Sequence, residues 1–428
     1  MRIIIVSTAL ALTAGFLALG GCNDGNGGGG GAKVRVVNAS MDYPAVDMYL
    51  DDKLKIADVG YETGSSYLKV DADTYATEFT SAGASSALAT FNQTYSNDDR
   101  YTLLALGRTG SFQVLTLNET ADEAPKGESR IRLVNAASDA GNLDVYLTDA
   151  DTALVDAAPT FADVPGDTLA SGGFVVVDSG AYRLRVTAAG STSDVRLDVA
   201  AVDLASKAVY TFVLTGTTGG VLVDAMLLPQ GGAVTLLTNG KARVRAVVGL
   251  DGGTSATVSA DATSLLSGAS IPVLGNYQPV DAGSTVVTLT VDGTTIPMGD
   301  VTLASGSDYT LVYTGAAASP QQAVVADVNR LPDTGTFKIR LINAMSALDE
   351  PLSLTVNFLP AVDSVGLGSV ALSDQIDAFT NGRLDVTRVT TSTVLYSVTN
   401  LTLESEGVYT QVMFGSSSAA TGALRKDR

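Results

Sequence analysis

Two short sequence signatures recur four times in the same order, about 100 residues apart, and this repetition constrains the fold more than any other feature. The first signature reads arginine, two aliphatic residues, asparagine and alanine; it begins at Arg35, Arg132 and Arg340, with a degraded copy at Arg245. The second, Tyr-Thr followed by four residues and glycine, begins 64 to 78 residues further on in every copy. A repeat of this length is too long for a solenoid and fits one domain per copy. We therefore predict four tandem domains, arranged as beads on a string.

Composition shifts predict where these domains begin and end. The polar stretch TADEAPKGES at 120–129 separates the first two copies, and segments rich in Gly, Pro and Asn near 229–240 and 331–335 separate the others. We predict a signal peptide at 1–22, a Gly-rich tether at 23–32, and units at 33–120, 130–229, 241–331 and 338–428, the third being the most divergent.

Each unit has the pattern of β structure. In the first unit, segments rich in Val, Thr, Tyr and Leu predict strands at 33–38, 45–56, 66–70, 75–80, 87–95, 100–106 and 112–117, with turns between them. The tyrosines of the second signature (Tyr101, Tyr210, Tyr309 and Tyr409) follow polar turns in most copies, as in a tyrosine corner. The predicted fold class is all-β: four tandem immunoglobulin-like β-sandwich domains after a signal peptide and a flexible tether.

Missing residue types exclude whole classes of chemistry. The chain has no histidine, no tryptophan and one cysteine, so it has no histidine-dependent catalytic triad, and zinc and copper lack their usual ligands. We predict no enzymatic activity, no cofactor and no metal site. The formal net charge of −19 also disfavours binding to nucleic acid.

The amino terminus predicts lipid anchoring. A short charged start and an apolar stretch lead to Leu19-Gly20-Gly21-Cys22, which resembles the bacterial lipobox, where the cysteine becomes lipid-modified. The alternative is a plain secretion signal with an incidental cysteine. Asn23 follows in place of the aspartate that often retains such proteins at the inner membrane, which favours the outer membrane. We predict a cell-envelope protein whose membrane partner is reached through the lipid on Cys22.

The residues that best suit a binding surface are two aspartate–tyrosine pairs. Asp47 and Tyr49, like Asp144 and Tyr146, are two residues apart and so lie on one face of a strand. This polar, aromatic face could bind a sugar or a peptide. The alternative is a solvated outer face or a tyrosine that covers the edge of the sandwich.

Other polar residues suggest structural roles. Asn38, Asn135 and Asn343 are predicted to form Asx turns at the end of the first strand of their units. Acidic clusters at Asp51-Asp52, Asp71/Asp73, Asp98-Asp99 and Asp149/Asp151 could be read as calcium sites, but none has a recognised loop spacing, which favours solvated turns.

The combination of R-[VLI]-[VI]-N-A-S, a following D-x-Y and a closing Y-T-x-x-x-x-G resembles the bacterial domain of unknown function 4397. The resemblance is clear in units one and two; unit four has Leu352-Ser353-Leu354 in place of D-x-Y, and unit three has lost both the Asn and the D-x-Y. It implies tandem immunoglobulin-like sandwiches on exported or lipid-anchored envelope proteins, and it implies no activity.

These observations favour a non-enzymatic, lipid-anchored envelope protein that acts in adhesion, in binding an unidentified protein or glycan, or as a spacer. One alternative is a periplasm-facing accessory subunit of an assembly or secretion complex. A third, less favoured, is a hydrolase that uses Asp or Glu, which would need two carboxylates converging in a pocket.

Overall fold

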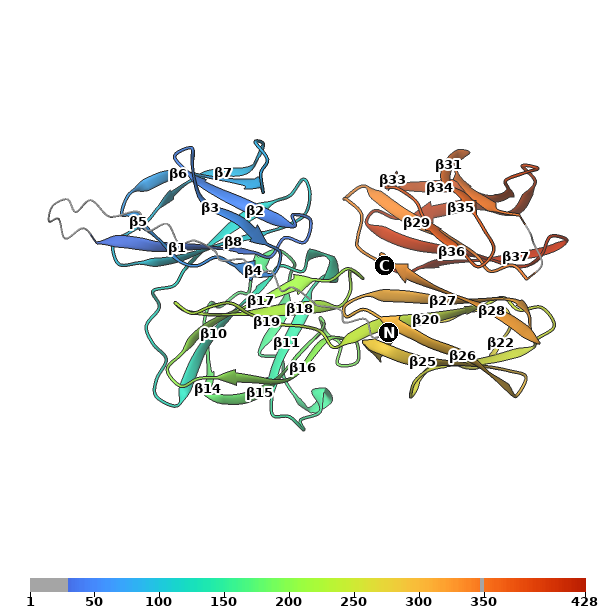
Figure 1. Cartoon of the computed structure of the whole chain (residues 1–428), viewed down its shortest axis with the longest axis horizontal. Helices are drawn as coiled ribbons and strands as arrows, with labels where there is room; N and C mark the ends of the chain where they lie inside the picture. The colour runs from blue at the N-terminus through green and yellow to red at the C-terminus, as the bar shows by residue number, and fades with distance from the viewer. Residues whose placement is uncertain (1–29, 347–349) are drawn as a thin grey trace, which may run out of the picture.

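Segments of alternating aliphatic and polar residues fold into strands throughout the chain, and the strands form four β-sandwiches (Figure 1). The structure, a computed structural model, describes residues 30–346 and 350–428. The predicted signal peptide, Cys22 and most of the predicted tether lie outside the described residues. The predicted fold class, four tandem immunoglobulin-like sandwiches, is confirmed.

Each unit consists of two sheets, which we name the pairing sheet and the outer sheet. In unit 1 the pairing sheet contains β1 (Gly31–Asn38), β4 (Thr63–Gly64), β5 (Leu68–Asp71), β8 (Arg100–Leu106) and β9 (Gln113–Asn118). Its outer sheet has the order β3 (Lys53–Gly60), β2 (Ala45–Leu50), β6 (Thr74–Ser81) and β7 (Ala87–Thr94).

Unit 2 repeats this plan and adds one strand. Its pairing sheet contains β10 (Glu128–Asn135), β13 (Thr168–Leu169), β14 (Val175–Asp178), β17 (Val209–Gly216), β18 (Val223–Pro229) and the additional β19 (Thr235–Leu237). Its outer sheet contains β11 (Leu143–Thr148), β12 (Phe161–Val164), β15 (Gly180–Ala188) and β16 (Val195–Leu204). Two short 3-10 helices, η1 (Ser138–Ala140) and η2 (Leu154–Asp156), flank β11.

Units 3 and 4 keep the same two sheets. The pairing sheet of unit 3 contains β20 (Lys241–Val248), β23 (Val273–Leu274), β24 (Gln278–Asp281), β27 (Asp308–Ala316) and β28 (Ser319–Asp327). The pairing sheet of unit 4 contains β29 (Thr336–Asn343), β32 (Val370–Leu372), β33 (Ile376–Asp377), β36 (Gly407–Ser416) and β37 (Ala419–Lys426). The outer sheet of unit 3 contains β21 (Ser255–Ala260), β22 (Thr263–Ser270), β25 (Gly283–Val291) and β26 (Thr294–Leu303). The outer sheet of unit 4 contains β30 (Leu352–Val356), β31 (Leu359–Val365), β34 (Phe379–Arg388) and β35 (Val394–Leu403).

The first strand of every unit is buried on both faces. In β1, Val34 and Val36 point into the core of unit 1, whereas Arg35 and Val37 point to the opposite side and are buried there as well. The strand also pairs in parallel with the tyrosine strand, with Val34 opposite Tyr101. The two strands that carry the repeated signatures are therefore neighbours in the pairing sheet.

Two details of the predicted strands were wrong. The predicted strand 45–56 is a hairpin, β2 and β3, because Asp51 and Asp52 adopt φ values of 47° and 60°, which suit a tight two-residue turn. Strand β1 begins at Gly31, within the predicted tether, because Gly31 and Ala32 pair with β5.

The local motifs predicted at the ends of the strands are confirmed. The hydroxyl of each signature tyrosine accepts a hydrogen bond from the backbone N–H five residues earlier, at 2.8 to 3.2 Å, which is a tyrosine corner. Asn38 and Asn135 each accept the backbone N–H two residues further on through Oδ1 at 3.0 Å, as in an Asx turn. Asn343 makes the same contact at 3.4 Å.

The units pack in pairs, so the predicted beads-on-a-string arrangement is wrong. The pairing sheets of units 1 and 2 share a buried apolar cluster that includes Val37, Leu104, Val134 and Met226. Those of units 3 and 4 share another, which includes Phe414. Figure 1 shows the two pairs side by side, with the outer sheets facing away from the partner unit. Pairing buries the aliphatic side chains on the outward face of each pairing sheet, such as Val37 and Leu104, which would otherwise be exposed.

Several contacts join the two pairs, and one residue at this junction is Asp139, in helix η1 of unit 2. Its carboxylate accepts hydrogen bonds from Arg330 Nε at 2.8 Å and from the backbone N–H of Leu331 at 2.9 Å, both in the linker between units 3 and 4. It also lies 2.9 Å from Nη2 of Arg108 in unit 1. One buried carboxylate of unit 2 thus contacts both unit 1 and the linker between units 3 and 4. No helix within the described residues is long and apolar enough to cross a membrane.

Candidate functional site

The repeated signatures meet in space at the surface where two units pair. In unit 1, Arg35 is 1% exposed, and its guanidinium donates to Thr102 Oγ1 at 2.7 Å and to Glu119 Oε1 at 2.7 Å. The ring of Tyr67 stacks on that guanidinium, with 4.7 Å from Cζ to the ring centroid, and its hydroxyl donates to Glu119. Arg35 also donates through Nη1 to the carbonyl of Gly232 in unit 2, at 2.6 Å. The cluster therefore links the two units.

Units 3 and 4 exchange the same contacts reciprocally. Arg245 of unit 3 donates to Asp427 of unit 4 at 2.9 Å, while Arg340 of unit 4 lies 3.0 Å from Asp427 and 3.3 Å from Asp327 of unit 3. Both arginines are at most 1% exposed. Tyr277 stacks on Arg245 at 4.5 Å and donates its hydroxyl to Asp327 at 2.7 Å. Such desolvated, charge-assisted contacts fix the geometry of a pair, because removal of one partner would leave a charge buried alone.

Unit 2 departs from this pattern. Arg132 is 9% exposed; it donates to Thr211 Oγ1 at 2.8 Å and to the carbonyl of Asn118 in unit 1 at 3.2 Å, and it packs on Phe174. Strand register places Gln230 where the other units carry Glu119, Asp327 or Asp427. Burial lowers the pKa of Arg132 below its ordinary value. The signature clusters of the first pair therefore set two buried arginines, Arg35 and Arg132, against one buried carboxylate, Glu119.

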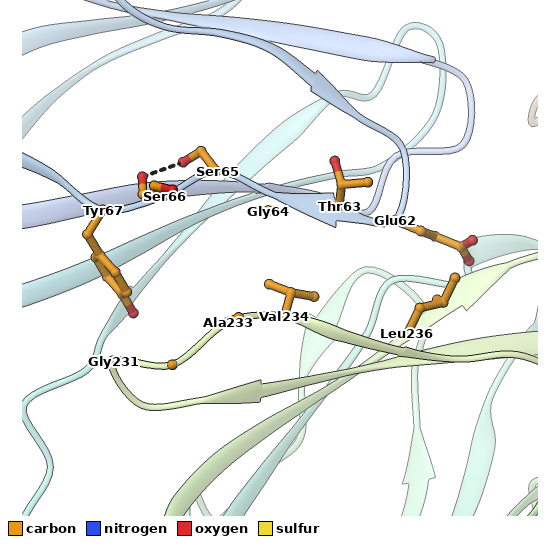
Figure 2. Close-up of a pocket in the computed structure, with 11 residues that line it drawn as sticks. Glu62, Thr63, Gly64, Ser65, Ser66, Tyr67, Gly231, Ala233, Val234 and Leu236 are labelled. Atoms are coloured by element: carbon orange, nitrogen blue, oxygen red, sulfur yellow. Dashed lines mark hydrogen bonds between the residues drawn. The ribbon is translucent and has the colours of Figure 1, made fainter.

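A cleft of about 500 Å³ lies beside the first cluster, between units 1 and 2 (Figure 2). One wall is the segment from Glu62 to Tyr67, and the other is the hairpin that leads into β19, from which Val234 points into the gap. The carboxylate of Glu62 accepts a hydrogen bond from Thr215 Oγ1 at 2.6 Å. Burial, together with the nearby charge of Asp224, raises the pKa of Glu62. Hydroxyl groups, one carboxylate and apolar side chains suit a small polar ligand.

The aspartates of the predicted binding face are buried. Asp47 accepts the backbone N–H groups of Asp58 at 2.7 Å and Gly83 at 2.9 Å. Asp144 makes the same two contacts in unit 2, with Asp163 and Gly190. These carboxylates hold neighbouring turns against the middle strand of the outer sheet.

The tyrosines of that face differ between the units, since Tyr49 is partly exposed and Tyr146 is 3% exposed. A binding role for Asp47, Tyr49, Asp144 and Tyr146 stays a prediction. Cys22, the predicted lipidation site, lies outside the described residues. In residues 30–346 and 350–428, no group of three or more acidic or cysteine side chains is placed to hold a metal ion.

The acidic members of the arginine clusters were not predicted, although the sequence carries a signal for them. In units 1, 3 and 4 the acid follows the threonine of the Tyr-Thr signature by 17 residues, as in Thr102 and Glu119. Across a hairpin this spacing brings the two side chains together on the same face of adjacent strands. The third repeated signature, which contains Tyr67, Phe174 and Tyr277, supplies the stacking ring.

Two solved structures resemble this chain at low identity. One is a proposed cell adhesion protein from Bacteroides uniformis, with 11% identity, 47% of this chain and 99% of that chain covered, and a TM-score of 0.21. The other is the Bacillus anthracis TIE protein, with 8% identity, 86% and 66% covered, and a TM-score of 0.14. No curated protein matches the chain significantly.

The sequence profile of a family described as a domain of unknown function, DUF4397, matches residues 32–146 and 242–350. The two matched regions together span more than half of the chain and begin in the first strands of units 1 and 3. Both contain the paired first strand with its buried arginine, Arg35 or Arg245. The chain therefore belongs to the DUF4397 family, in tandem copies.

Proposed function

We propose that this protein is a non-enzymatic, lipid-anchored protein of the cell envelope that presents binding surfaces on a rigid stack of paired β-sandwiches. The observation that carries the proposal is the convergence of the repeated signatures on the surfaces where units pair. The recurring residues thus hold neighbouring units in a fixed relative orientation, as a scaffold requires.

Pairing gives such a scaffold its stiffness. Single-chain tandem domains with small contacts move relative to one another, whereas these units share apolar clusters and buried ion pairs. The outer sheets and their loops face away from the pair surface, and such sheets and loops are suitable contact surfaces for a protein or glycan partner.

The lipobox-like sequence ending at Cys22 supports attachment to the membrane. A thioether-linked diacylglyceryl group plus an amide-linked chain would supply the multiple acyl chains that stable anchoring requires. The glycines after Cys22 would leave a short flexible connection to the first unit.

The test compares intact cells that express the chain with cells that express Cys22→Ser. Protease or antibody accessibility of the units on intact cells, together with attachment of the cells to host-matrix and glycan surfaces, is measured for both. The proposal expects the chain in the membrane fraction, and Cys22→Ser released with loss of attachment. The proposal would be contradicted if Cys22→Ser stayed in the membrane fraction like the parent chain, or if the purified protein degraded an envelope polymer. Units protected on intact cells would favour the periplasmic accessory role over surface adhesion.

A further inference from the structure

Arg425 of unit 4 occupies a position that carries an aliphatic residue in the other three units. In the closing hairpin, the residue opposite the signature threonine is Leu117, Leu228 or Val325 in units 1, 2 and 3, but Arg425 in unit 4. In the first two units this residue is among the buried apolar side chains between paired sheets. An arginine in place of an aliphatic residue departs from the pattern of the repeat, and such local departures commonly mark functional positions.

Arg425 also adds a positive charge to a cluster in which two arginines, Arg245 and Arg340, and two carboxylates, Asp327 and Asp427, otherwise balance. Its Nε lies 3.2 Å from Asp427, a carboxylate already contacted by Arg245 and Arg340. With Asp327, this cluster contains three guanidinium groups and two carboxylates among the described residues. Burial, and secondly the charge of Arg245, lowers the pKa of Arg425. Arg425 is held at this position by the carbonyl of Gly275 and the amide oxygen of Asn276, at 2.8 and 3.0 Å.

This side chain lines a cleft of about 410 Å³ where units 2, 3 and 4 meet. The cleft is bordered by Asp194 of unit 2, by Arg243, Asn276 and Tyr277 of unit 3, and by Arg425 and Lys426 of unit 4. Arg243 is held against Asp308 at 2.8 Å, and Tyr277 stacks on it at 4.8 Å. Three basic residues, Arg243, Arg425 and Lys426, therefore line the cleft beside two carboxylates, Asp194 and Asp427, in a chain whose formal net charge is −19.

The cleft occupies the same place in its pair as the cleft beside Tyr67 does in the first pair. Both lie where the ring that stacks on a buried arginine faces the end of the partner unit's closing hairpin, which is the segment 231–236 after β18 in the first pair and the end of β37 in the second. In the first pair, Val234 and Leu236 of the β19 hairpin line this space; in the second, Arg425 and Lys426 do. The two clefts therefore differ at this wall, where the first has apolar side chains and the second has basic side chains.

We propose that the cleft between units 2, 3 and 4 binds the oxyanion group, carboxylate or phosphate, of a small ligand, with Arg425 as its main donor. Nε and Nη1 of Arg425 make the contacts described above, which leaves the two N–H groups of Nη2 to donate to the oxygens of such a group. The cleft lies within the size range of small-ligand sites, and Tyr277 and Asn276 supply a ring and an amide at its wall. This site does not depend on membrane anchoring.

The test titrates the full chain carrying Cys22→Ser with glucuronate, a dipeptide of two glutamates, and inorganic phosphate, with glucose as the neutral probe. Binding is measured calorimetrically and as a rise in melting temperature at constant ionic strength, since a ligand that binds only the folded state stabilises it. At least one anion, and not glucose, is expected to bind. The arms distinguish a sugar acid, an acidic peptide and a phosphate as the source of the oxyanion.

Arg425→Leu restores the residue type of the other units. It is expected to lower the affinity about tenfold or more, as loss of a charge-assisted contact does, while melting no lower than the parent. Asn276→Asp, a change at an exposed position, adds a negative charge at the rim and is expected to abolish binding without removing Arg425. Arg383→Gln, an arginine of the outer sheet of unit 4, is the matched control and should bind as the parent does. Absence of binding by all three anions, or equal affinity of Arg425→Leu and the parent, would overturn the proposal.

Discussion

The buried arginine of each first strand is stable only because its surroundings supply the opposite charge. Arg35, Arg245 and Arg340 are each within 4 Å of a carboxylate, at exposures of at most 1%. Breaking such a buried pair costs about 3–5 kcal/mol, because one charge is left without a partner in a region of low polarity. Arg132 is the exception, since the equivalent position is Gln230.

We predict that Gln230→Glu stabilises the protein. The substitution loses the hydrogen bond that the Gln230 amide donates to the carbonyl of Ala121. We expect a charge-assisted contact between the new carboxylate and the buried guanidinium of Arg132 to outweigh that loss by about 1 kcal/mol. Thermal unfolding monitored by circular dichroism measures the effect. Gln321→Glu, at an exposed position of β28, is the control and should leave the melting temperature unchanged. An equal or lower melting temperature for Gln230→Glu would show that Arg132 needs no carboxylate.

Because of Glu62, we predict an unusual pH dependence of the stability of the contact between units 1 and 2. Its folded-state pKa is raised above 4.5, first by burial and then by Asp224. The protonated form is therefore favoured by folding, and its stabilisation is complete below about pH 4.5 and is lost as the pH rises through the raised pKa. Glu62→Gln, which keeps a neutral side chain at every pH, should raise the melting temperature at pH 7.5 and change it little at pH 4.

The comparison of Glu62→Gln with the parent at the two pH values isolates this group from the other acids. Glu123→Gln, a 74% exposed glutamate, serves as the control and should show no such difference. A melting temperature lowered by Glu62→Gln at pH 7.5 would mean that the carboxylate is stabilised as an anion by its contact with Thr215.

At the scale of the strand, the close approach of two units explains why unit 3 has glycine where the other units have alanine. A Cβ added to Gly249, just after β20, would lie 1.9 Å from the carbonyl oxygen of Ala344 in unit 4. The third unit therefore departs from the Asn-Ala signature at a point where the backbones of two units touch. The change from alanine to glycine at this position of the repeat is therefore required by the close packing of units 3 and 4.

We predict that Gly249→Ala destabilises the second pair by about 1–3 kcal/mol, the usual cost of overpacking a site whose neighbour is backbone. Denaturant unfolding measures the loss. Gly240→Ala, immediately before the same strand and with open space around its Cβ, is the matched control. Equal stability of the two variants would show that units 3 and 4 can separate locally without cost.

The glycine that closes the Tyr-Thr signature also has a conformational reason. Gly107 and Gly415 adopt φ values of 91° and 86°, in the region that favours glycine, and an added Cβ would lie within 2.3 Å of a carbonyl oxygen across the hairpin. The signature could be recognised in the sequence because its tyrosine, threonine and glycine each have a structural role close to their own position in the chain.

At the scale of the whole molecule, polar contacts join the two pairs, and the carboxylate of Asp139 makes two of them. Asp139 is 4% exposed and receives hydrogen bonds from Arg330 and Leu331, while Arg108 of unit 1 forms an ion pair with it. Because one carboxylate satisfies groups from unit 1 and from the linker between units 3 and 4, its removal would leave two guanidinium groups with fewer partners.

We predict that Asp139→Ala loosens the junction while each pair stays folded. Small-angle X-ray scattering should show a larger radius of gyration, and limited proteolysis should cut faster at the linker around 331–335. Asp156→Ala, in the other 3-10 helix of unit 2 and exposed to solvent, is the control. Unchanged scattering for Asp139→Ala would show that other contacts between the pairs are sufficient.

The sequence by itself determined the number of units, their β character, the tyrosine corners and the Asx turns. These features depend on residues close together in the chain or on strict repetition, which can be read directly; Asn38 and Tyr101 act on backbone groups two and five residues away. Only the tertiary structure decided that the units pair, because the partners of Arg35 and Arg245 lie 197 and 182 residues away in the next unit. A buried arginine and an exposed one look the same in a sequence, and the difference arises when two sheets remove both faces of one strand from water.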